Sequence, residues 1–170
     1  MIKTIIILLI STGIVKSLVL NRTILIEHYG YSTDSIYIDL SNNSLDLIDS
    51  ATFHSFNKLE VLYLDENKIS KLDYGLFNNL KSLRQLWLES NSLIDVNRKS
   101  FEGLNSLELV CLSNNPISNL FPNYLVSLCE TNIKCVVKVF EKCQRNNTSI
   151  QITTPQTDTT TSIEESIILI

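Results

Sequence analysis

One pattern of apolar and polar positions recurs every 24 residues along the middle of the chain. Segments that begin at Ser35, Leu59, Leu83 and Leu107 align at this spacing, and only Ser35 departs from the shared apolar and Asn columns. The equivalent positions form columns of the same residue type: Ile38, Leu62, Leu86 and Val110; Leu40, Leu64, Leu88 and Leu112; Asn43, Asn67, Asn91 and Asn115; Leu45, Ile69, Leu93 and Ile117; Ile48, Leu72, Val96 and Leu120; Phe53, Phe77, Phe101 and Leu125; Phe56, Leu80, Leu104 and Leu128. So regular a period predicts stacked coils that bury one continuous core.

Each segment opens with alternating residues, which predicts a strand with its Leu side chains inward and the residues between them outward. Successive strands should stack in parallel. The Asn column follows each strand. A buried Asn side chain carries two N–H donors and an acceptor, so we expect it to satisfy backbone groups of the turn that would otherwise be buried without partners.

The repeat resembles the extracellular type of leucine-rich repeat, LxxLxLxxNxLxxLxxxxFxxLxx, over residues 35–128. The resemblance implies an α/β fold: a right-handed solenoid with a parallel β-sheet on its concave face and loops or short helical turns on its convex face. It also implies a recognition module rather than an enzyme.

The flanking segments predict a secreted protein. Residues 1–17 read as a signal peptide, with Lys3 before an apolar run and Val15-Lys16-Ser17 as a cleavage site; an uncleaved anchor is the alternative. Residues 18–34 are the expected N-terminal cap and residues 129–145 a cysteine-containing C-terminal cap with a fifth strand. Residues 146–170 are Thr-rich and read as a disordered tail. The chain as written contains no expected membrane span.

The N-terminal cap contains no cysteine, because the first cysteine of the chain is Cys111. We therefore expect an extended segment or a hairpin that caps the first coil by packing alone.

In a secreted chain the four cysteines become expected disulfide partners. Cys129–Cys143 is the favoured bridge. Cys111–Cys135 is a second candidate because a 24-residue spacing would place the two on neighbouring strands, and a free Cys111 is the main alternative. Sequons mark four candidate glycosylation sites: Asn21, Asn42, Asn146 and Asn147.

The outward strand positions gather aromatic and acidic side chains. Tyr63 and Trp87 should be adjacent, exposed and rimmed by carboxylates, which suits a protein contact with a basic partner. The predicted partner-binding residues are Asp39, Tyr63, Asp65, Glu66, Gln85, Trp87 and Glu89. The formal net charge is −4 and no Lys/Arg cluster is present, so nucleic acid is not an expected partner.

No residue set suggests catalysis. The two histidines, His28 and His54, fall in the cap and on the convex side, away from the carboxylates of Asp65 and Glu89. No nucleophile–base set is present, and the cysteines lack the spacing of a zinc site. We expect no enzyme activity, no cofactor and no metal.

The function predicted from the sequence is extracellular protein binding through the concave face. Two alternatives stay open: a truncated or membrane-tethered receptor ectodomain, and a structural component of the extracellular matrix. The sequence names no ligand.

Overall fold

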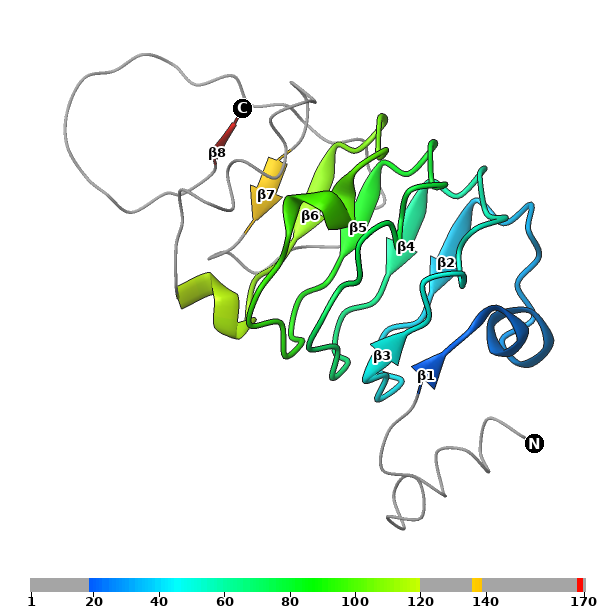
Figure 1. Cartoon of the computed structure of the whole chain (residues 1–170), viewed down its shortest axis with the longest axis horizontal. Helices are drawn as coiled ribbons and strands as arrows, with labels where there is room; N and C mark the ends of the chain where they lie inside the picture. Colours follow the sequence, from blue (N-terminus) through cyan, green and yellow to red (C-terminus); the bar gives the residue numbers. More distant parts are fainter. Residues whose placement is uncertain (1–18, 120–135, 139–167, 170) are drawn as a thin grey trace, which may run out of the picture.

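The computed structural model describes residues 19–119, 136–138 and 168–169. Its main sheet has six strands in the order β2-β4-β5-β6-β7-β8, and a separate sheet pairs β1 with β3. Figure 1 shows the strands β2 to β7 of the main sheet side by side in one row, with the rest of each coil extending from the row. The strands of the main sheet are β2 (Tyr37–Asp39), β4 (Val61–Tyr63), β5 (Gln85–Trp87), β6 (Leu109–Cys111), β7 (Val136–Lys138) and β8 (Ile168–Leu169). The predicted signal peptide lies outside the described residues.

The first four strands of this sheet stack in parallel at the period of the sequence. Ile38 lies opposite Leu62, Leu62 opposite Leu86, and Leu86 opposite Val110. Every strand is therefore displaced by one 24-residue repeat from its neighbour, as the columns predict. Short 3₁₀ turns occur in the described loops at η2 (Arg98–Phe101) and η3 (Pro116–Asn119).

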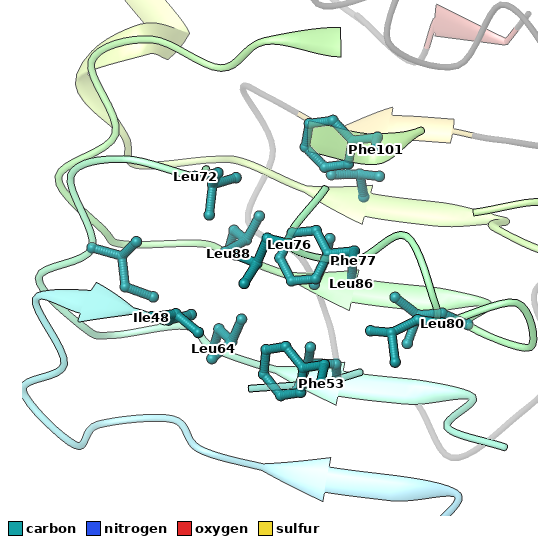
Figure 2. Close-up of a cluster of buried hydrophobic side chains, with 14 of the residues drawn as sticks. Ile48, Phe53, Leu64, Leu72, Leu76, Phe77, Leu80, Leu86, Leu88 and Phe101 are labelled. Carbon is teal, nitrogen blue, oxygen red and sulfur yellow. The ribbon is translucent and has the colours of Figure 1, made fainter. Parts of the chain in front are cut away.

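The apolar columns form one core between the sheet and the opposite side of the coils. Its described members are all less than a tenth exposed. Phe77 stacks on Phe53 with 6.1 Å between ring centroids, and Phe101 follows at 6.3 Å, so the aromatic column runs through three coils. Figure 2 shows these rings among the Leu side chains that fill the same layers. Core packing therefore links each coil to the next.

The Asn column bonds each coil to the one before it. Asn67 Oδ1 accepts from the backbone N–H groups of Asn43 and Leu45, both at 3.0 Å. Its Nδ2 donates to the carbonyls of Leu40, Leu64 and Asp65. Asn91 and Asn115 repeat most of this pattern one and two coils later, and all four Asn side chains are buried. These side chains satisfy polar backbone groups that the core shields from water.

The N-terminal cap begins as an extended segment, one of the two expected forms, and continues as a helical turn rather than a hairpin. Its first strand, β1 (Val19–Leu20), pairs in parallel with β3 (Leu47–Ile48), and a helical turn, η1 (Ile24–His28), follows. Asn21 Oδ1 accepts from the backbone N–H of Ile24 at 2.9 Å, which holds the start of that turn. The helical turn forms because Leu25 fills the end of the core from this position and is fully buried there.

The cap also closes the first coil with hydrogen bonds, so the expectation of packing alone is wrong. The hydroxyl of Tyr31 both accepts from the N–H and donates to the carbonyl of Asp39, each at 2.9 Å. These are groups of β2, the edge strand of the sheet, and no other described strand lies on that side of it. The hydroxyl of Tyr29 donates to Asn43 Oδ1 at 3.0 Å, in the place that a preceding coil would fill. Burial, and secondarily the nearby Tyr31, raises the pKa of Tyr29 above its ordinary value of 10, so this hydroxyl keeps its proton at neutral pH.

Tyr31→Phe is expected to lower the free energy of unfolding by about 1–2 kcal/mol, because both hydrogen bonds to Asp39 are lost while the ring remains. Urea unfolding followed by circular dichroism measures the difference. Tyr37→Phe is the matched control, since its hydroxyl makes an exposed bond to Asp39 Oδ2. Equal losses in the two variants would contradict the proposed role of Tyr31 as an edge cap.

At the other end of the sheet the spacing changes. Strand β7 pairs in parallel with β6, which confirms the expected fifth strand, but Cys111 lies opposite Lys138 rather than Cys135. The chain therefore advances by more than one repeat between these strands, and the argument that placed Cys111 beside Cys135 is wrong. The expected disorder of residues 146–170 is also wrong at its end, since β8 pairs antiparallel with β7. Ile168 and Leu169 are apolar, Ile is enriched in strands, and the pair covers the edge of β7.

Candidate binding face

The outer face of the sheet is the face turned away from the main core, and it carries the residues that the sequence places between the inward Leu side chains. Three aromatic rings follow one another across it. Tyr37 and Tyr63 have their ring centroids 5.4 Å apart, and Tyr63 and Trp87 have theirs 5.3 Å apart. Cys111 is the next residue opposite Trp87 on the neighbouring strand. The four side chains thus form a continuous row across strands β2, β4, β5 and β6.

The expected exposure of Tyr63 and Trp87 is wrong. Tyr63 is 8% exposed and Trp87 is 3% exposed, and with Cys111 they form a second apolar cluster separate from the main core. Val61 and Leu109 pack against this cluster. Strand alternation predicted which face these side chains occupy, but side-by-side stacking and the neighbouring residues remove them from solvent. Replacing Trp87 would therefore disturb packing as well as any contact with a partner.

Two of the predicted carboxylates are buried beside this cluster. Asp65 is 9% exposed and Glu89 is 8% exposed. Glu89 Oε1 lies 3.5 Å from Asn114 Nδ2, and its Oε2 lies 3.9 Å from Cys111 Sγ. These acids contribute negative charge to the face, although their own surfaces are mostly covered.

The accessible part of the predicted site lies toward the N-terminal strands. Glu66 is exposed, and Asp39 and Gln85 are half-buried. The Asp39 carboxylate is held in place, since its Oδ1 accepts from the N–H and the hydroxyl of Ser41. Tyr37 was not among the predicted binding residues, yet it is 46% exposed and begins the aromatic row. Its outward position on a strand was the feature that could have identified it.

Cys111 is disulfide-bonded, which excludes the alternative of a free thiol at this position. Its partner lies outside the described residues, as do Cys129, Cys135 and Cys143. The bridge Cys129–Cys143 therefore stays a prediction. A sulfur in a disulfide carries no proton, so the 3.4 Å contact with Ser113 Oγ is one in which the hydroxyl donates.

The candidate glycosylation sites differ in their surroundings. Asn42 is exposed in the turn after β2, at a positive φ of 53°. Asn21 is half-buried and its Oδ1 already accepts from Ile24 N. Asn146 and Asn147 lie outside the described residues. Asn42 is thus the better placed of the two described sites for a glycan.

Neither histidine forms an ion pair with an acidic residue of the part of the chain that the structure describes. His54 is exposed, and His28 packs its ring edge-on against Tyr29 with 5.5 Å between centroids. Within residues 19–119, 136–138 and 168–169, no group of three His, Cys, Asp or Glu side chains is placed to hold a metal ion. The same part of the chain contains no helix long and apolar enough to cross a membrane.

Comparison with known proteins agrees with the repeat geometry. The leucine-rich repeat family matches residues 36–93. A crystal structure of a TLR13–ssRNA13 complex is similar in fold, with a TM-score of 0.56 and 18% sequence identity. The match covers 73% of this chain and 18% of that protein. No curated protein matches the sequence at a significant level.

The structural likeness concerns the fold, in which parallel strands of successive coils form one sheet. Folds of this type are ordinarily binding modules. From the family match over residues 36–93, the 24-residue strand register and this likeness, we conclude that the stacked coils of this chain are leucine-rich repeats.

Proposed function

We propose that this protein is secreted and binds another extracellular protein through the N-terminal part of the outer face of its sheet, the face that the sequence predicts to be concave. The observation that carries the proposal is the accessible start of the aromatic row. Tyr37 is 46% exposed beside Asp39, and Glu66 is exposed one coil farther on. A tyrosine supported by packed rings is a typical anchor of a protein interface.

Packing against buried aromatic rings holds the Tyr37 side chain rigid. Tyr37 stacks on Tyr63, which stacks on Trp87, and neither of the latter two is free to move into solvent. A side chain that is already ordered loses less conformational entropy on binding than a mobile one. The buried part of the row thus supports the exposed part rather than contacting the partner itself.

Charge indicates the kind of partner. The face carries the carboxylates of Asp39, Asp65, Glu66 and Glu89, so a partner with Lys or Arg side chains would be attracted and correctly oriented. The same charge repels a phosphate backbone, and therefore we favour a protein over the RNA named for the TLR13 complex. The disulfide at Cys111 supports an oxidising compartment. Catalysis and cofactor binding form no part of the proposed function.

The experiment begins with the full chain expressed through a secretory pathway. Proteins cross-linked to it at the cell surface or in the medium are identified, and the affinity of each purified partner is then measured. The double variant Tyr37→Ala/Glu66→Lys is expected to weaken binding at least tenfold, because it removes the anchor and reverses an exposed charge. Lys81→Ala, an exposed change on another side of the coil, is the control.

An unchanged affinity in the double variant would refute the proposed face. Retention of the wild-type chain inside the cell with reduced cysteines would refute secretion. Immobilisation in an insoluble matrix would favour the structural alternative, whereas attachment to the membrane would favour a receptor ectodomain. Binding of single-stranded RNA with an affinity that the double variant loses would replace the protein partner.

A further inference from the structure

A second candidate surface lies on another side of the coils, after the Asn turns of the second and third repeats. Residues 70–74 of one coil and Ile94, Asp95 and Asn97 of the next border a groove of about 490 Å³. We name it the Tyr74–Ile94 groove after its two most exposed apolar residues. Tyr74 is 66% exposed and Ile94 is 64% exposed, which makes them the most exposed large apolar side chains in the described part of the chain.

The groove has an apolar base and a fixed aromatic wall. Leu72 borders it and belongs to the main core, where it is 4% exposed. The Tyr74 hydroxyl accepts from Asn97 Nδ2 at 3.2 Å, so the neighbouring coil holds the end of the ring. The exposed rim is therefore ordered before any partner arrives, which lowers the entropic cost of binding.

The charges around the groove are unbalanced. Lys71 Nζ pairs with Asp73 Oδ1 at 2.6 Å, and this hydrogen bond, followed by the charge attraction, raises the pKa of Lys71. Asp95 borders the same groove and is exposed, and no hydrogen bond or ion pair joins its carboxylate to a side chain that the structure describes. Hence one carboxylate is available beside two exposed apolar side chains.

We propose that the Tyr74–Ile94 groove binds a segment of another protein that carries one Lys or Arg between apolar residues. The cation pairs with Asp95 and lies near the ring of Tyr74, which adds a cation–π attraction. The flanking apolar side chains cover Ile94 and the ring of Tyr74, and so remove apolar surface from water. This surface is separate from the outer face of the sheet, so the protein would offer two contacts to its partners.

The test uses the full chain labelled with ¹⁵N and two short synthetic peptides. One peptide carries a lysine between two leucines, and its twin carries glutamate in place of the lysine. We expect saturable chemical-shift changes for the backbone amides of residues 70–74 and 94–97 with the lysine peptide. The dissociation constant should rise about tenfold in Asp95→Asn and at least tenfold in Tyr74→Ala, and the glutamate peptide should not bind.

Glu102→Gln is the matched control, because it removes one exposed negative charge elsewhere; it should bind the lysine peptide like the wild type. Three results would overturn the proposal: no saturable shift, equal binding of both peptides, or shifts that centre on Tyr37 and Glu66. The proposal would also be overturned if the wild type formed a concentration-dependent dimer and Tyr74→Ala stayed monomeric, because a second copy of the chain would then occupy the groove. The Tyr37→Ala/Glu66→Lys variant should keep peptide binding, so failure of the proposed outer-face contact and failure of this groove are distinguishable.

Discussion

Phe77→Ala is expected to lower the free energy of unfolding by about 3–5 kcal/mol, the usual range when a buried aromatic ring is removed from a core. Phe77 is fully buried and stacks between Phe53 and Phe101 (Figure 2). Its loss leaves a cavity that borders three coils at once, and those coils cannot close it without shifting inward from their stacked positions. Thermal and urea unfolding of the purified chain measure the loss.

Phe77→Leu serves as the graded control, since it keeps most of the apolar volume and should cost clearly less. Tyr37→Ala is the control for an aromatic ring on the other face, where 46% exposure leaves less to lose. If Phe77→Ala and Tyr37→Ala destabilised the protein equally, the aromatic column could not be the centre of the core.

Asn67→Ala is expected to cost about 2–4 kcal/mol, because it leaves several buried backbone groups without partners. Its side chain bonds to five of them: the N–H groups of Asn43 and Leu45 and the carbonyls of Leu40, Leu64 and Asp65. Equilibrium unfolding gives the size of the loss. Hydrogen exchange should also speed up at the amides of Asn43 and Leu45, which donate directly to Asn67.

Glu66→Ala is the matched control for this variant. Glu66 precedes Asn67 but is exposed, and both Glu and Ala carry a Cβ at its positive φ of 55°. We therefore expect little change in stability. Similar small effects in both variants would mean that water or relaxed backbone replaces the Asn side chain.

The central coils could be predicted from the sequence because the same 24-residue pattern of apolar and Asn positions occurs four times. A single apolar run fits a strand or a helix, but Leu62 and its equivalents in the other repeats occupy one column, and each lies in the same place on its strand. The Asn column was predictable for the same reason, since a loop residue has no cause to return at every turn in one register.

The ends and the binding face were less predictable because they depend on contacts made only once. The repeat pattern does not predict that the Tyr31 hydroxyl would form hydrogen bonds with the backbone of Asp39. It also does not predict that Lys138 of β7 would lie opposite Cys111. Alternation assigns Trp87 to the outer face, yet its exposure depends on what packs beside it. The backbone conformation before each buried Asn could not be predicted either. A positive φ usually indicates glycine, but the residues with a positive φ there are Asn42, Glu66, Ser90 and Asn114.

The tyrosine-based N-terminal cap has a consequence for the order of events during synthesis. Tyr29 and Tyr31 complete the first coil without any oxidation step, and the first cysteine of the chain arrives only at Cys111. Because chains fold from the N-terminus as they are made, the early coils can close on the ribosome while the rest is still being translated. Disulfide formation at Cys111 then takes place on a chain whose N-terminal coils are already folded and capped. Each later coil can pack against the exposed edge of the coil before it.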